Sequence, residues 1–260
     1  MSQGMRLLSH AVLGALISFG LGARAAEPVF RSAFGPGEQS TFDVSYLGVP
    51  TGIATITVGL KMQHLGKDVW PLVCTAQTDL DIYPVRDRFI SYWDFAAGHN
   101  IASEFHADEN KKRRREKFRY DREEAKILAT KQAGGKPEVE RTYELPPGAV
   151  DLAAAAFQVR NRPLKLNEEI TISIFTGVIT YQMNAKVEGR VKLQTPMGEK
   201  DCLQVSFTAD WSGGLATRRA LTMYFTDDAF HIPVRFTADL MLGTVVADLK
   251  TYYPGRDYSK

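Results

Sequence analysis

Side chains capable of acid–base chemistry cluster at two turn signals in this sequence. The stretch TDDAFHIPVR groups Asp227, Asp228 and His231. A carboxylate beside a histidine can transfer protons in a pocket that matches their pKa values, although an Asp-Asp pair between two strands more often stabilises a turn. With Asp87 and Asp94 from a second stretch, Asp228 completes a set of carboxylates that could hydrolyse glycan or peptide links of a cell envelope. A hydrolase that uses these carboxylates is therefore one of the functions that the sequence leaves open.

The second stretch, YPVRDRFISYWD, mixes aromatic and charged side chains around a predicted turn. Sugar rings stack on aromatic faces while their hydroxyls bond charged groups, so this composition suits a carbohydrate or peptide surface. The simpler interpretation is a pair of ion-paired strand ends with a buried tryptophan. The candidate ligand-binding residues are Tyr83, Arg86, Asp87, Arg88, Tyr92 and Trp93.

Motifs for the common catalytic chemistries are absent from the sequence. It contains no G-x-S-x-G, H-E-x-x-H, phosphate-binding loop or dinucleotide fingerprint. The histidines beyond the first 26 residues, His64, His99, His106 and His231, are scattered singly, and no pair has metal-ligand spacing. We therefore predict no catalytic residues, no metal and no cofactor, and a binding protein is favoured over an enzyme.

The most basic stretch, KKRRREKFRY at residues 111–120, has the pattern of a strand with two different faces. One face ends in Phe118 and Tyr120, and the other is entirely cationic. Flanking acids could pair with these cations across neighbouring strands, and lysines on an edge strand also oppose aggregation. Alternatively, the cations bind an anionic envelope polymer or lipid headgroups, at about 1 kcal/mol for each exposed contact. The candidate residues for such anionic-surface binding are Lys111, Arg113, Arg115, Lys117 and Arg119.

The first 26 residues have the layout of a cleavable secretory signal peptide. Arg6 precedes an apolar run over residues 7–21, and the small-residue sequence Ala23-Arg24-Ala25-Ala26 follows it. The run is shorter than the roughly 20 residues of a spanning helix, so we predict a periplasmic or secreted protein with no transmembrane anchor after cleavage. Loss of Arg6 and Arg24 from the 32 basic residues balances them against the 30 acidic ones. Neither that balance nor export favours a nucleic-acid partner.

Cys74 and Cys202 are the only cysteines in the sequence. In an oxidising compartment two cysteines most simply form a disulfide, which makes this pair the disulfide candidate. Two separate buried thiols are the alternative, because free cysteine is among the most buried residue types. The sequence leaves both possibilities open.

Beyond residue 26, apolar and polar residues alternate with a period of two between turn signals such as GVPTG, QAGGKPE and TDDAF. This pattern predicts a single all-β domain over residues 27–260, mainly antiparallel, built as a curved meander sheet or half-open β-barrel. One alanine-rich segment between prolines predicts a helix at about 149–161. Since the middle of this helix is apolar nearly all round, we expect it to be covered on more than one side, either across the open face of the sheet or on the outside of a sandwich.

Four stretches in order along the chain carry a family resemblance. They are FGPGEQSTFDVSYLGVPTGIATITV, TDLDIYPVRDRFISYWD, VDLAAAAFQVRNRPL and MYFTDDAFHIPVRFTADLMLGTVVADLKTYY. With these stretches the chain resembles an exported bacterial family known as domain of unknown function 3108. The resemblance implies a periplasmic or secreted all-β protein and brings no established reaction. A weaker likeness is to the lipoprotein-carrier type of fold, in which a helix caps a curved antiparallel sheet over an apolar hollow.

These observations favour an exported, non-enzymatic binding or carrier protein for an envelope lipid or polysaccharide, with an apolar groove partly covered by the predicted helix. Two alternatives remain: the cell-envelope hydrolase, and a structural partner of an envelope assembly that binds no small ligand. The three differ in whether the concave side of the sheet holds an apolar cavity or packed side chains.

Overall fold

The computed structural model describes residues 33–78, 84–110, 112–209, 221–240 and 243–256, so the predicted signal peptide, Tyr83 and Lys111 lie outside the described residues. Within the described part the chain forms 15 strands and one helix. The strands before the helix are β1 (Gln39–Tyr46), β2 (Val49–Val58), β3 (Met62–His64), β4 (Lys67–Thr78), β5 (Arg86–Asp94), β6 (His99–Glu109), β7 (Lys112–Asp121), β8 (Lys126–Ala133) and β9 (Val139–Glu144). The helix α1 (Leu152–Arg160) is followed by β10 (Glu169–Phe175), β11 (Thr180–Thr195), β12 (Gly198–Ala209), β13 (Leu221–Thr226), β14 (Pro233–Leu240) and β15 (Gly243–Tyr253).

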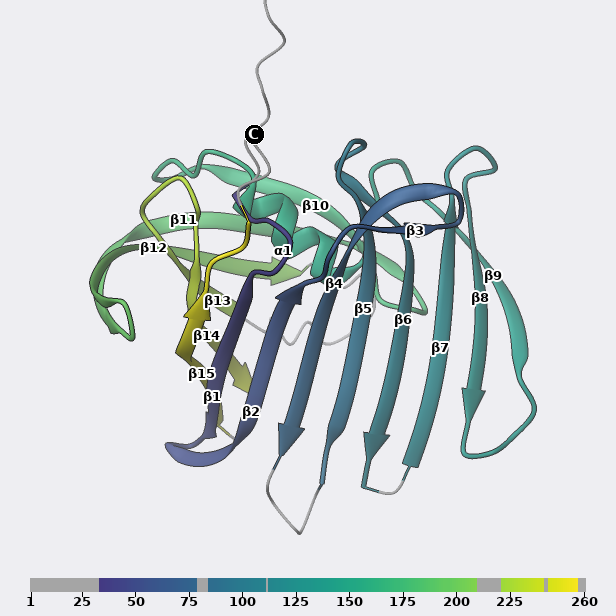
Figure 1. Ribbon diagram of the computed structural model, residues 1–260, viewed down its shortest axis with the longest axis horizontal. Coiled ribbons are helices and arrows are strands. Elements are labelled where there is room, and N and C mark those ends of the chain that lie inside the picture. The colour runs from purple at the N-terminus through teal and green to yellow at the C-terminus, as the bar shows by residue number, and fades with distance from the viewer. Residues whose placement is uncertain (1–32, 79–83, 111, 210–220, 241–242, 257–260) are drawn as a thin grey trace, which may run out of the picture. The chain divides into compact units, whose positions relative to one another are not determined.

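The strands form one open antiparallel sheet in which neighbours in sequence are mostly neighbours in space (Figure 1). From β1 the chain adds β2 and then β4 to β9, which is one edge, while β3 pairs only with β4. It then passes through α1 to β10 at the other edge and returns strand by strand to β15. β15 pairs with β1 from Gln39 opposite Tyr253 to Tyr46 opposite Val245. The predicted antiparallel meander is confirmed.

Two of the hairpin turns share a leucine–glycine pair. Leu47 and Gly48 join β1 to β2 with φ angles of 51° and 77°, and Leu65 and Gly66 join β3 to β4 with 49° and 76°. Positive φ at both central residues gives a turn whose twist matches the right-handed twist of the flanking strands. Glycine adopts this conformation without steric cost, whereas leucine does so only because the paired strands hold it there.

The helix lies where the alanine-rich segment predicted it, over 152–160. Asp151 caps its first turn, since the Asp151 Oδ1 atom accepts a hydrogen bond of 2.8 Å from the backbone N–H of Ala154. Six of its nine residues are buried, and it contacts β4, β5, β6 and β10. The expectation of cover on more than one side is therefore confirmed. In the described part of the chain, no helix has the length and hydrophobicity needed to cross a membrane.

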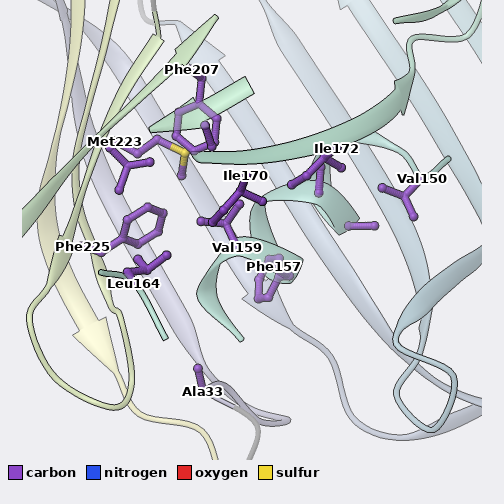
Figure 2. Packing of buried hydrophobic residues seen from close by; sticks show 14 of the residues in the cluster. Ala33, Val150, Phe157, Val159, Leu164, Ile170, Ile172, Phe207, Met223 and Phe225 are labelled. Carbon is purple, nitrogen blue, oxygen red and sulfur yellow. The ribbon is translucent and has the colours of Figure 1, made fainter. Parts of the chain in front are cut away.

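The largest apolar cluster joins the helix to both halves of the sheet (Figure 2). Phe157 and Val159 of α1 belong to it with Ile170 and Ile172 of β10 and Phe225 of β13. The same cluster includes Phe34, Trp70 and Trp93 from the first half of the chain. Because the sheet is open, this cluster and the pairing of β15 with β1 are the main links between the two halves.

A buried ion pair fixes the end of the helix. Arg160 Nη1 lies 2.7 Å from Glu38 Oε1, and both side chains are almost fully buried. The same guanidinium donates through Nε to the carbonyl oxygen of His231 at 3.0 Å and through Nη2 to that of Phe230 at 3.1 Å. Glu38 precedes β1, and Phe230 and His231 lie in the turn before β14. Arg160 therefore ties α1 to both sides of the seam between β1 and β15.

Candidate ligand-binding cavity

The concave side of the sheet holds a cavity of about 480 Å³. One wall comes from β4 to β7, the opposite wall from β10 to β14, and the first turns of α1 close the space between them. Most side chains that face this space are apolar. The phenylalanine and methionine side chains among them are Phe89, Phe105, Phe118, Phe175, Met183, Phe207, Met223 and Phe236.

The register of the sheet explains why these residues meet. Cys74, Phe89, Phe105 and Glu116 are paired in turn across β4, β5, β6 and β7, so they form one row on the concave face. Residues two positions along each strand face the same way, and they form a second row that includes Ser91, Ser103 and Phe118. Opposite this wall, α1 contributes Ala153 and Ala156, whose short side chains leave room inside.

Three polar side chains face the cavity from its most buried part. Asp151, Ser103 and Tyr120 are 2%, 1% and 5% exposed. The Ser103 and Tyr120 hydroxyl oxygens lie 3.4 Å apart. Burial raises the pKa of Asp151 to about 7, although the backbone N–H of Ala154 opposes the shift. Burial also raises the pKa of Tyr120, so this phenol stays protonated.

A lysine beside the cavity connects β8, the strand next to one edge of the sheet, to the turn that follows β10 at the other edge. Lys131 of β8 donates a hydrogen bond to the carbonyl oxygen of Gly177, in the turn between β10 and β11. Its Nζ atom also lies 3.9 Å from Glu116 and 5.4 Å from the centre of the Phe118 ring. Glu116, Phe118 and Gly177 all line the cavity. Lys131 thus holds the β10–β11 turn against β7 and β8, where the sheet itself is not closed.

The candidate ligand-binding residues of β5 do not face this cavity together. Arg86 and Arg88 are exposed, and Tyr92 packs on the opposite face, where His64 stacks on its ring at 3.8 Å. The Tyr92 hydroxyl donates to Glu104 at 3.0 Å, whereas Trp93 is buried in the main cluster. The pKa of Asp87 is raised to about 6 by burial and by the neighbouring Glu109. The structure therefore divides this set between two faces of the sheet.

A second, more polar depression combines residues from both sequence-based candidate sets. It has a volume of about 500 Å³ and is lined by Pro84, Arg86, Asp108, Arg113, Gly134 and Gly135. Two arginines, Arg86 and Arg113, line this depression. Arg113 already has an acidic partner there, because its Nε atom donates to Asp108 Oδ2 at 3.1 Å.

The basic strand β7 has the two faces that its alternation predicts. Glu116, Phe118 and Tyr120 face the cavity, whereas the cations Arg113, Arg115, Lys117 and Arg119 are exposed on the other side. Pairing with a flanking acid across strands is found at Arg113, which contacts Asp108 of β6 at 3.1 Å, whereas Arg119 contacts Asp121 of its own strand at 3.5 Å. Lys117 lies opposite Glu104 and Arg115 opposite His106 in the register with β6.

Two of the three carboxylates considered for hydrolysis, Asp94 and Asp228, support turns. Asp94 Oδ1 accepts hydrogen bonds from the backbone N–H groups of Ala96 and Ala97 at 3.1 and 3.0 Å. Asp228 Oδ1 accepts from the backbone N–H groups of Phe230 and His231 at 2.9 and 3.2 Å. None of Asp87, Asp94 and Asp228 lines the cavity. Among the described residues there is also no group of three or more metal-ligating side chains that could hold a metal ion.

The two cysteines are free thiols, so the disulfide considered from the sequence is not formed in this structure. Cys74 lines the cavity, whereas Cys202 is buried in a separate apolar cluster with Phe42, Val234 and Leu249. Burial raises the pKa of Cys74 to about 12 and that of Cys202 to about 11. The sequence placed both in strands, but only the fold shows that each thiol has apolar surroundings of its own.

Comparison with known families gives a match over residues 41–250 to the model described as Protein of unknown function (DUF3108). The chain belongs to this DUF3108 family. A solved structure with a similar fold is the β-barrel-like protein of domain of unknown function DUF1849 from Brucella abortus, with 11% identity and a TM-score of 0.56, covering 86% of the DUF3108 chain and 99% of the other. This likeness concerns the fold alone. The resemblance inferred from the sequence motifs is confirmed.

A more distant match to the DUF3108 chain is a proposed exported protein with a YmcC-like fold from Bacteroides fragilis, with 12% identity and a TM-score of 0.34. Another is a proposed lipoprotein from Parabacteroides distasonis, with 11% identity and the same TM-score. In each case the match covers 86% of the DUF3108 chain and 99% of the other chain. No curated protein matches the chain.

Proposed function

We propose that this chain is an exported, non-enzymatic binding protein that holds the apolar part of an envelope lipid between α1 and the concave face of the sheet. The observation that supports this function is the cavity of about 480 Å³ with mainly apolar walls. Sites that enclose small molecules have volumes of about 300–1,000 Å³, with apolar walls and a few polar groups. The walls favour a lipid chain over a polysaccharide.

Transfer of an acyl chain into this space would provide most of the binding free energy. Each buried methylene contributes about 0.8 kcal/mol, so ten of them contribute about 8 kcal/mol before the cost of association. Phenylalanine side chains on both walls and methionine side chains on the β10–β14 wall give such a chain apolar contacts on two sides. Export is proposed from the signal-like residues 1–26, which would place the protein beside envelope lipids.

Neither alternative function has a specific observation in its favour. The hydrolase would need carboxylates free to act on substrate, yet Asp94 and Asp228 accept backbone hydrogen bonds at turns. A purely structural partner would have no use for an apolar cavity of this size, because unfilled space costs stability through lost packing contacts.

Filling the cavity tests the proposal. Ala156 of α1 lines the cavity and is half-buried, so Ala156→Trp places a large ring in it. We expect this variant to lose binding of the fluorescent apolar probe 1-N-phenylnaphthylamine and of decyl-chain ligands that displace it. Gln182→Trp is the matched control, because Gln182 is exposed on β11 between the lining residues Tyr181 and Met183. Equal probe binding by both variants, or no probe binding by the wild type, would refute the lipid-binding function.

A further inference from the structure

A cluster of buried polar side chains lies under the first turn of α1. The second row of the concave face supplies Ser91 and Ser103, the next positions supply Asn100 and Tyr120, and Asp151 faces them from the helix. All five residues are at most 5% exposed. Such a concentration of polar groups in an otherwise apolar interior has a cost unless the groups form hydrogen bonds.

Several atoms of this cluster have unused hydrogen-bonding capacity. Asp151 Oδ1 is occupied by the backbone N–H of Ala154, but Asp151 Oδ2 has no hydrogen-bond partner within the described part of the chain. The same holds for Ser91 Oγ and for both side-chain polar atoms of Asn100. Asp151 lines the cavity while its Oδ2 atom is itself buried, so a ligand donor reaches this oxygen when the carboxylate turns toward the cavity. Leaving a buried acceptor without a donor costs about 1–3 kcal/mol, which a ligand donor would recover.

The charge of the cluster is already balanced within the protein. Arg122 donates through Nη2 to the carbonyl oxygens of Asn100 and Ala149, both at 3.1 Å, and its charge favours the ionised form of Asp151. Since Ala149 and Asp151 both lie just before the first residue of α1, the Arg122 guanidinium lies beside this end of the cluster. An ionised Asp151 therefore has a cationic neighbour without any ligand.

We propose that Asp151, Ser103 and Tyr120 form a subsite for an uncharged hydrogen-bonding headgroup, a hydroxyl or an amide, at the inner end of the apolar ligand. This inference rests on the proposed lipid-binding function and defines the class of lipid. A hydroxyl donates its hydrogen to Asp151 Oδ2 and accepts one from the Ser103 or Tyr120 hydroxyl. An amide satisfies the same two atoms with its N–H and carbonyl groups.

Charged headgroups fit this subsite less well. A carboxylate would lie against the Asp151 carboxylate in a poorly hydrated space, where two like charges cannot both stay ionised. An ammonium group would pair with Asp151 but would compete with Arg122 for it and would lose its own hydration. The subsite therefore discriminates by headgroup among ligands that have the same chain.

Four ligands with the same decyl chain test this inference: 1-decanol, decanamide, decanoate and decylamine, each used to displace 1-N-phenylnaphthylamine from the full chain at pH 8. We expect decanol and decanamide to bind at least about tenfold more tightly than decanoate, which is the effect of one hydrogen bond to a buried ionised group. Equal affinities of all four ligands would refute the subsite and leave the lipid-binding function intact. Failure of every ligand to displace the probe would refute both.

Two variants test whether Asp151 and Ser103 cause the preference for uncharged headgroups. Asp151→Asn keeps a helix cap, since asparagine caps about as well as aspartate, and it should reduce the preference for decanol over decanoate to about threefold or less. Ser103→Ala should weaken decanol binding about threefold to tenfold and leave decanoate nearly unchanged. Far-UV circular dichroism identifies any variant that fails to fold. A folded Asp151→Asn variant with the wild-type preference would overturn the assignment of Asp151.

Discussion

Arg160 and Glu38 are 122 residues apart in the sequence, yet Arg160 Nη1 and Glu38 Oε1 lie 2.7 Å apart in the interior. Removing either partner leaves a buried charge without compensation, which typically costs about 3–5 kcal/mol. We expect Glu38→Gln and Arg160→Met each to lower the free energy of unfolding by about that amount, measured by urea denaturation. The double variant should lose less than the sum of the single losses, because the two residues act as one unit.

The exposed pair of Lys250 and Asp43, 2.9 Å apart, is the control for this prediction. Surface ion pairs contribute about 0–1 kcal/mol, so Asp43→Asn should leave the free energy of unfolding within about 1 kcal/mol of the wild type. A Glu38→Gln variant as stable as Asp43→Asn would show that the buried pair does not fix α1.

The Asp151 carboxyl should make stability depend on pH. Its pKa rises from an ordinary 3.8 to about 7 on folding because burial disfavours the charged form. The folded state therefore binds the proton more tightly, and Asp151 lowers stability increasingly as the pH rises from about 4 to about 7. Asp151→Asn removes this titration. Relative to the wild type, the variant should gain at least about 1 kcal/mol between pH 5 and pH 8.

Polar and charged neighbours oppose this upward shift of the Asp151 pKa. The Ala154 backbone N–H and the charge of Arg122 both favour the ionised carboxylate, so removal of Arg122 should raise the Asp151 pKa further. Urea denaturation of both proteins at pH 5, 6, 7 and 8 measures the difference. A stability gap between wild type and Asp151→Asn that stays constant over this range would contradict the shifted pKa.

The cysteines should react slowly in the native protein. Both pKa values are raised by burial, so little thiolate is present at pH 7. We expect maleimide to label Cys74 and Cys202 fully after unfolding without reductant, and only slowly before it. Occupation of the cavity by decanol should slow Cys74 further without affecting Cys202. If unfolding without reductant left both cysteines unlabelled, they would be joined in a disulfide.

The outer cations of β7 should affect surface binding more than stability. The triple variant Arg113→Gln, Arg115→Gln and Lys117→Gln removes exposed charges, so the free energy of unfolding should change by less than about 1 kcal/mol. Binding to vesicles of phosphatidylglycerol should weaken at low salt, at about 1 kcal/mol for each cation lost. A matched control replaces Lys165, Lys186 and Lys200 with Gln. Equal vesicle binding by both triple variants would exclude the β7 row as a membrane contact.

The sequence contains enough information to predict the strands, the helix and the two faces of β7. Local rules are sufficient for these elements. Period-two alternation predicts a strand, and alanines between prolines predict a helix, whatever the distant residues are. The turn after β7 and the Asp151 cap follow from the same rules. The Glu38–Arg160 pair does not, because nothing in the local sequence indicates which elements meet.

The cavity could not be predicted from the sequence for a related reason. Phe89, Phe105 and Phe118 lie in three different strands, and only the register shows that they face the same side. The stretch at 83–94 has the composition of a binding surface, yet successive residues of β5 face opposite sides of the sheet. Buried serines such as Ser91 and Ser103 give no signal in sequence, because serine is common at the surface of sheets.

The pairing of β1 with β15 has a consequence for how the chain acquires its structure. Gln39 of β1 lies opposite Tyr253 of β15, so the middle of the sheet cannot form until both of these distant segments have been synthesised. Contacts of such wide sequence separation form slowly. DUF3108 chains should therefore stay incompletely folded for longer than proteins built from local hairpins alone. Until β1 and β15 have paired, they should depend more on chaperones.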